Sequence, residues 1–165
     1  MAYYEKVLLY AYPHLEDLSR QIDELVLKRA LSSFSNYTCC ETQCEMILNM
    51  SDQKVRLLAL KSRLDEILTR LTDYEIELLE YKYFKRKPKS SFSDFDSTSR
   101  QYFRRQLKLT EKISALLNRV GMTEKWFNEN YLDIDFMKLL LDRVIEYENN
   151  GNINKNKNKK RPNEK

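Results

Sequence analysis

The sequence predicts an all-α protein, and two observations carry this prediction. Only 2 glycines and 3 prolines occur in 165 residues, so the chain has few of the residues that tight turns in a sheet require. Most apolar residues recur at spacings of three and four, which is the period of helices with one buried side. The length suits one domain, or one domain with an extension.

The first 70 residues predict an antiparallel helical hairpin. Residues 3–34 form one helical segment with a bend at Pro13, and its apolar seam is Leu8, Ala11, Leu15, Leu18, Ile22 and Leu25. A second seam is Met46, Met50, Gln53, Leu57, Leu60, Leu64, Ile67 and Leu71. Both have coiled-coil spacing, and the short polar stretch "SSFSNYTCCET" lies between them. A hairpin is the simplest arrangement, and parallel pairing with a second chain is the alternative.

A new helix is predicted to start at Thr72. Thr72 and Glu75 have the spacing of a capping box, and Leu71 and Ile76 are placed as its hydrophobic staple. We expect the helix to run through "DYEIELLEYKYF" and to bury Ile76, Leu79 and Tyr83.

Two further helices are predicted before residue 121. Pro88 can open a short one, "KSSFSDF", that buries Phe92 and Phe95. Thr98 or Ser99 caps a long one, which Gly121 ends. Its apolar stripe is Tyr102, Gln106, Leu109, Ile113, Leu116 and Val120, flanked by Phe103, Leu107 and Leu117.

The end of the chain predicts two smaller helices and a tail. One helix includes Trp126 and Phe127, and the other runs from Asp135 to about Glu148. The tail "NNGNINKNKNKKRPNEK" has so few apolar residues that we expect disorder. The predicted division is therefore a hairpin or association region at 1–70, a second helical region at 71–148, and a disordered basic tail at 149–165.

Positive charge is concentrated in the middle of the chain. Residues 82–108 carry a net charge of +7, whereas the whole chain carries +4 and the remainder therefore −3. The basic residues of this stretch are Lys82, Lys85, Arg86, Lys87, Lys89, Arg100, Arg104, Arg105 and Lys108. Such a patch predicts a polyanionic partner better than the overall pI does.

The segment from Leu71 to Leu117 resembles region four of bacterial sigma factors and the regulators that share its helix-turn-helix. "LTDYE" opens the pattern, "EYKYF" closes its first helix, and Ser99 follows Phe84 by fifteen residues, as a serine precedes the family's recognition helix. Phe103, Arg104 and Arg105 occupy the apolar and arginine positions after it. Where the family has Ile-Ala and a glycine turn, this chain has Phe92-Ser93 and "DST".

A helical region before a single such motif is similar to phage-type transcription regulators of the RinA and ArpU kind. No sigma region two is recognisable, so we do not expect a complete promoter-melting sigma factor. The resemblance implies a sequence-specific DNA-binding transcription regulator, with 71–148 as a helix-turn-helix DNA-binding region followed by C-terminal helices. Its recognition helix is expected to begin near Ser99. A helical adaptor that binds RNA polymerase or another protein without touching DNA is the alternative.

Each candidate DNA-binding residue has an expected role. Arg100, Arg104 and Arg105 can bind phosphates or guanine edges, and Lys108 lies on the same polar side. Gln101 either reads adenine or completes a capping box with Thr98. The remaining candidates contact phosphates and position the protein: Lys85, Arg86, Lys87 and Lys89. The alternative for the whole set is a solvated basic helix face.

Other functions have weaker support in the sequence. Cys39, Cys40 and Cys44 with His14 lack the ligand set of a closed zinc site, so we expect packed thiols, no metal and no cofactor. One histidine, with no phosphate loop or nucleophile elbow, predicts a protein that is not an enzyme. No apolar run approaches the roughly 18 residues that span a membrane. We expect a cytoplasmic protein that binds double-stranded DNA, with RNA polymerase and a second copy of the chain as further candidate partners.

Overall fold

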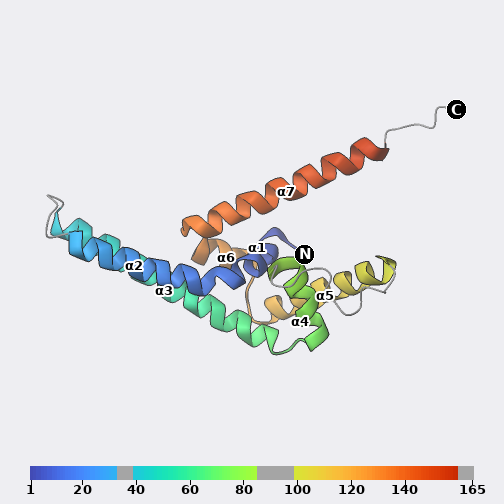
Figure 1. Cartoon of the computed structure of the whole chain (residues 1–165), viewed down its shortest axis with the longest axis horizontal. Helices are drawn as coiled ribbons and strands as arrows, with labels where there is room; N and C mark the ends of the chain where they lie inside the picture. Colours follow the sequence, from blue (N-terminus) through green and yellow to red (C-terminus); the bar gives the residue numbers. More distant parts are fainter. Residues whose placement is uncertain (33–38, 85–98, 160–165) are drawn as a thin grey trace.

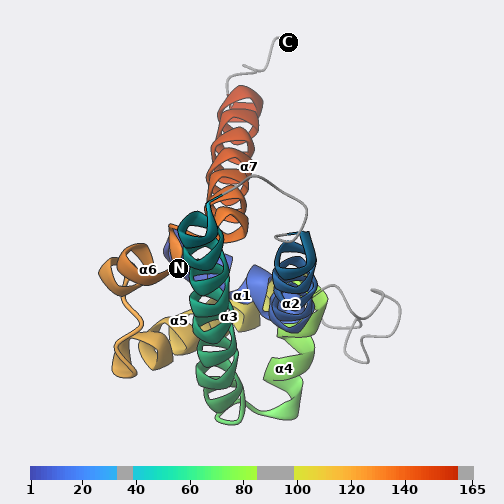
Figure 2. The same cartoon turned by 90° about the vertical axis from the view of Figure 1, so that its left-hand side faces the viewer.

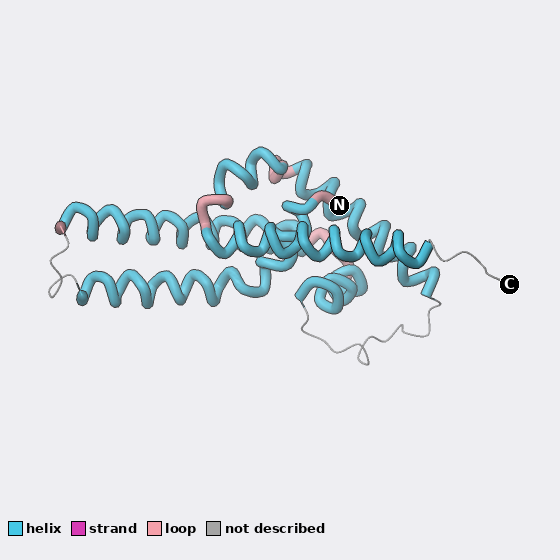
Figure 3. The backbone as a smooth tube through the Cα atoms, turned by 90° about the horizontal axis from the view of Figure 1, so that it is seen from above, coloured by secondary structure: helices cyan, strands magenta, loops and turns pink. Residues whose placement is uncertain are grey.

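The computed structural model describes residues 1–32, 39–84 and 99–159, and every regular element in these ranges is helical (Figures 1 and 3). The all-α prediction is therefore confirmed. The elements are α1 (Tyr3–Ala11), η1 (Tyr12–His14), α2 (Leu15–Ser32), α3 (Cys40–Leu68), α4 (Asp73–Leu79), η2 (Glu80–Phe84), α5 (Ser99–Arg119), α6 (Glu124–Tyr131) and α7 (Asp135–Lys159). In the described ranges, no helix is both long enough and apolar enough to cross a bilayer.

α2 and α3 lie side by side, run in opposite directions and project away from the rest of the molecule (Figures 1 and 2). The short helix η1, which contains Pro13, separates α1 from α2. Only the inner half of the predicted seam is closed, since Leu57 and Leu60 are buried whereas Leu25 is 47% and Met46 38% exposed. The outer half of the pair therefore leaves apolar side chains in contact with water.

α1 is the central element of the core. It packs against α6, α7 and η2, and its residues Val7, Leu8 and Ala11 are fully buried. The same core includes Phe127 and Met137 from the C-terminal part of the chain. The hydrophobic core therefore combines residues from both sides of position 70.

The carboxylate of Glu5 joins α1 to α5 inside this core. Its side chain is buried, and Ser114 Oγ donates a hydrogen bond of 2.8 Å to Glu5 Oε2. The backbone N–H of Ala2 donates a second bond to the same oxygen at 2.7 Å. A buried carboxylate needs such donors, so this contact fixes α5 against the start of the chain.

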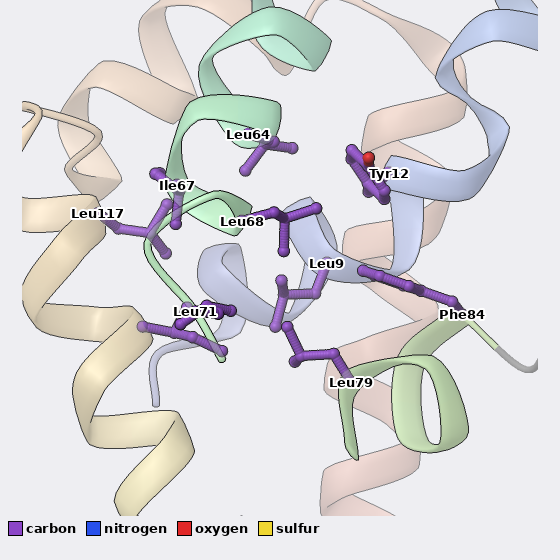
Figure 4. Close-up of a pocket in the computed structure, with 10 residues that line it drawn as sticks. Leu9, Tyr12, Leu64, Ile67, Leu68, Leu71, Leu79, Phe84 and Leu117 are labelled. Carbon is purple, nitrogen blue, oxygen red and sulfur yellow. The ribbon is translucent and has the colours of Figure 1, made fainter. Parts of the chain in front are cut away.

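α1, α3, α4 and α5 meet around a small apolar gap (Figure 4). Leu9, Leu64, Leu79 and Leu117 point towards it from these four helices. The gap has about 10 Å³ of free space, which is at most the volume of one water molecule. This junction is therefore close-packed core with no room for a ligand.

The predicted start of α4 is confirmed. Thr72 is the N-cap, its backbone N–H donates to Glu75 Oε2 at 2.9 Å, and the Glu75 N–H donates to Thr72 Oγ1 at 3.4 Å. These two bonds are the capping box that the sequence predicts.

The helix does not continue as a regular α-helix to Phe84, because the five residues Glu80–Phe84 form a π-helical turn, η2. The buried residues are Leu78, Leu79, Tyr83 and Phe84, whereas the predicted Ile76 is only half-buried. Leu78 and Tyr83 are five positions apart, as are Leu79 and Phe84. Because a π turn repeats every five residues in its hydrogen bonds, it brings both pairs towards the core.

α5 ends at Gly121 as predicted. Gly121 has a φ of 76°, Met122 N–H bonds to Leu117 O at 3.0 Å, and Gly121 N–H bonds to Asn118 O at 3.1 Å. This pair of bonds is a Schellman motif. Val120, which the sequence places in the buried stripe, is 36% exposed, whereas Leu117 and Met122 on either side of it are fully buried.

One arginine joins α3 to the turn that precedes α7. Arg56 on α3 contacts both carboxylate oxygens of Asp133 at 2.8 and 2.6 Å, and it also donates to Asn130 O at 2.6 Å. Its Nε lies 2.8 Å from Asp52 Oδ2. The hydrogen bond from Arg56 holds the pKa of Asp133 below its ordinary value.

α7 begins at Asp135 as predicted but continues to Lys159. The helix therefore runs about eleven residues past the predicted end near Glu148, into the segment that the sequence assigns to a disordered tail. Extending an existing helix costs less free energy than starting a new one, so the turns before residue 149 favour a helical conformation in the residues that follow. Pro162 is the first proline after Asp135, so no helix breaker of that kind stands earlier.

Candidate nucleic-acid interface

The first half of α5 presents a basic side to solvent. Arg100, Gln101, Arg104 and Lys108 are all exposed. At 3.6 residues per turn these four positions fall within a sector of about 100° on the helix. Figure 1 shows this end of α5 at the periphery, away from the α2–α3 pair. The structure thus brings four of the predicted site residues together on one accessible surface.

The cations on this surface are available for a ligand. In the described part of the chain, no ion pair involves Arg100, Arg104 or Lys108. A shallow hollow runs along the same side, lined by Gln101, Arg104, Arg105, Leu107, Lys108 and Glu111. Glu111 is the acidic member at its far end, so the basic character is strongest towards the helix N-terminus.

Arg105 lies differently from its neighbour Arg104. Its Nη1 donates a hydrogen bond of 2.7 Å to Tyr74 Oη, and its guanidinium lies 5.1 Å from the centre of the Tyr74 ring. Tyr74 belongs to α4, so this arginine contacts the neighbouring helix. Arg105 thereby contributes to the packing of α5 on α4.

A second contact fixes the same two helices. Lys112 Nζ lies 2.6 Å from Glu75 Oε2, so the carboxylate of the capping box also pairs with α5. Burial acts to raise the pKa of Glu75, but the hydrogen bonds from Lys112 and the Thr72 backbone outweigh it and lower this pKa. Arg105–Tyr74 and Lys112–Glu75 thus connect α5 to α4 at two points.

Several predicted residues lie outside the described ranges. These are Lys85, Arg86, Lys87 and Lys89, with the short helix expected after Pro88 and the cap at Thr98. Ser99 is the first residue of α5, but its side chain is not described. The helix-turn-helix between α4 and α5 therefore stays a prediction, whereas the contacts of α5 with α4 are observed.

Two apolar residues of this surface were not predicted as site residues. Phe103 is 67% and Leu107 60% exposed, and both lie beside the basic sector. One signal in the sequence could have revealed them, because Phe103 and Leu107 fall outside the helical stripe that contains Gln106.

The three cysteines are not packed thiols, and that prediction is wrong. Cys39, Cys40 and Cys44 are all exposed and free, because they lie at the outer end of α3, beyond the closed part of the seam. A hydrogen bond with Cys40 raises the pKa of the Cys44 thiol. Among the described residues, no group of three histidine, cysteine, aspartate or glutamate side chains is arranged to hold a metal ion.

Comparisons of the chain with protein families, with characterised proteins and with solved structures give no match. A function is therefore inferred from the exposed residues of α5 and their contacts.

Proposed function

We propose that the protein is a DNA-binding transcription regulator and that the exposed side of α5 is its contact with duplex DNA. The observation that supports this most is the set of cations Arg100, Arg104 and Lys108, which form no ion pair within the described ranges, with Gln101 beside them. They project from a helix that two polar contacts connect to α4. Exposed cations on a projecting helix can supply the phosphate and base-edge contacts of a DNA-binding protein.

The dimensions of this surface match a major groove. Arg100 and Lys108 are eight residues apart, which corresponds to about 12 Å along a helix axis. The major groove is about 12 Å wide, so one helix can reach phosphates and base edges in it at once. Gln101 has the amide that pairs with adenine, and Phe103 offers an apolar ring for a thymine methyl group.

Replacing Arg100 and Arg104 by alanine tests the proposal. Both are exposed and unpaired in the described structure, so helical content measured by circular dichroism should not change. Affinity for a random pool of short duplexes should fall by at least about tenfold, and the slope of log affinity against log salt should decrease by about 2. Fluorescence anisotropy at several salt concentrations measures both quantities.

The matched control removes two cations elsewhere. Arg20→Ala with Lys125→Ala makes the same change in net charge at exposed ion pairs on α2 and α6. It should leave both affinity and salt slope nearly unchanged. Equal effects of the two double variants would show that DNA affinity depends only on the net charge of the protein, and would contradict the proposal. Arg105 is kept in both variants because it contacts Tyr74.

The alternative is a helical adaptor that binds RNA polymerase or another protein, and the exposure of Phe103 and Leu107 favours it. Exposed apolar anchors at the centre of a patch are typical of protein contacts. Phe103→Ala with Leu107→Ala would then abolish capture of purified RNA polymerase. In the adaptor case the full chain should also show no duplex binding that weakens with salt.

A further inference from the structure

A second basic site lies in a groove between α1, η2 and α7, away from the exposed side of α5. The groove has a volume of about 490 Å³ and includes Lys6, Lys82 and Arg143 in its lining. Volumes of this order are typical of sites for small ligands. The lining also includes Tyr10, Tyr83 and the carboxylate of Glu148.

The positive charge of this groove is only partly compensated. Lys6 Nζ pairs with Glu148 Oε1 at 2.7 Å, whereas Lys82 and Arg143 have no ion pair with any residue in the described part of the chain. Burial, and then the nearby charge of Lys6, lower the pKa of Lys82, and the charge of Glu148 only partly opposes them. An anion in the groove would stabilise these cations.

Aromatic side chains form the wall next to the cations. The rings of Tyr10 and Tyr83 meet edge to face with centres 5.0 Å apart, and Lys82 Nζ lies 5.1 Å from the centre of the Tyr83 ring. A phenol is protonated at neutral pH, and burial raises the pKa of both of these further. The wall thus adds no negative charge and offers ring surface beside the ammonium groups.

We propose that this groove binds a small ligand that carries a phosphate group, with Lys82 and Arg143 as its charge-assisted donors. Glu148 competes with the ligand for Lys6, because its carboxylate already forms an ion pair with the Lys6 ammonium group. A phosphate group has several acceptor oxygens, so it can bind cations that lie on three separate elements, here α1, η2 and α7. Inorganic phosphates and nucleotides share this chemistry, and only nucleotides also carry a ring that can contact the tyrosines.

Isothermal titration of the full chain with pyrophosphate and with ADP, at low salt, tests this proposal. Lys82→Gln should weaken the binding of pyrophosphate by about tenfold, the effect of losing one charge-assisted hydrogen bond. Glu148→Gln should tighten it, since the competing carboxylate is removed. Lys125→Gln, an equal change of charge at an exposed position of α6, should have no effect. Tighter binding of ADP than of pyrophosphate identifies a nucleotide, and equal binding identifies the phosphate group alone.

Several results would overturn the proposal. These are no heat with either ligand, equal weakening by Lys82→Gln and Lys125→Gln, or weaker binding after Glu148→Gln. If Lys82→Gln changes the circular dichroism spectrum, Arg143→Gln on the exposed side of α7 replaces it, and unchanged affinity in that variant overturns the proposal. Lys82→Gln should not change affinity for duplex DNA. A loss there equal to the loss for pyrophosphate would make the groove part of a DNA surface.

Discussion

Gly121 is the residue whose conformation matters most for the end of α5. Its φ of 76° lies in the left-handed region, and a Cβ atom added at this position would meet open space. Only the backbone conformation therefore disfavours a residue with a side chain here. We expect Gly121→Ala to lower the free energy of unfolding by about 1 kcal/mol. Urea denaturation followed by circular dichroism measures this change.

Gly151 provides the matched control, because it lies within α7, where the backbone is helical. Alanine favours an interior helical position over glycine by about 1 kcal/mol. Gly151→Ala should therefore leave stability unchanged or raise it, together with the helical signal. A loss of stability in Gly151→Ala, or none in Gly121→Ala, would contradict the two backbone assignments.

Residues that act on their immediate neighbours could be predicted from the sequence. The Thr72 cap with Glu75 and the Gly121 terminus depend on contacts within five positions of the chain, and both are confirmed. The exposure of Phe103 and the contact of Arg105 with Tyr74 depend on the side from which another helix approaches. No local pattern contains that information, so the sequence placed Phe103 beside the core stripe and Arg105 on the DNA surface.

At the scale of elements, the contact of α4 with α5 should depend on pH. The folded state lowers the pKa of Glu75, so its contribution to stability is complete above the unfolded value of about 4.3 and is lost as pH falls through the folded value. Glu75→Gln should therefore cost about 1 kcal/mol at pH 7 and progressively less below pH about 4. Urea denaturation of both proteins between pH 7 and pH 3 measures the difference.

Glu129→Gln is the control for this pH dependence. Glu129 pairs with Lys125 at 3.7 Å on the exposed side of α6, and such surface pairs contribute little to stability. This variant should differ little from the parent protein at any of these pH values. A difference for Glu75→Gln that stays constant from pH 7 to pH 3 would show that the carboxylate charge does not hold α5 on α4.

The elements themselves were predictable where their apolar period is regular. α3 and α5 follow such patterns. The π turn of η2 could not be predicted in this way, because it depends on Leu78 and Tyr83 both facing one core. The extension of α7 to Lys159 was not predictable from composition, because low apolar content indicates a lack of packing and does not stop an existing helix.

For the whole molecule, the arrangement depends on contacts between distant parts of the sequence. α1 packs on α6 and α7, and Lys6 pairs with Glu148. Arg56 similarly connects α3 with the turn at Asp133. The apolar seams predicted that α2 and α3 would be buried along one side, but no spacing within a helix indicates that α1 lies at the centre. Residues 1–70 and 71–148, which the sequence analysis separates, thus contribute to one shared core.

The last prediction concerns the basic tail and follows from the DNA-binding proposal. Residues 149–165 carry a net side-chain charge of +5, since five lysines and one arginine stand against Glu164. Such a segment can neutralise phosphates without reading bases. Deleting residues 149–165 should therefore weaken binding to all duplexes by a similar factor and flatten the salt dependence, with the preferred sequence unchanged. Anisotropy titrations on a best-bound and a scrambled duplex at several salt concentrations measure all three effects.

The deletion leaves Glu148 and its pair with Lys6 in place, so the packing of α7 on α1 is preserved. A tail that only keeps the protein in solution would give unchanged affinities and an unchanged salt slope. A deleted protein that no longer distinguishes the best duplex from the scrambled one would show that the tail reads sequence. Because recognition by α5 and neutralisation by the tail change different quantities, the ratio of the two affinities separates them: it should fall with Arg100→Ala and Arg104→Ala, and stay constant with the deletion.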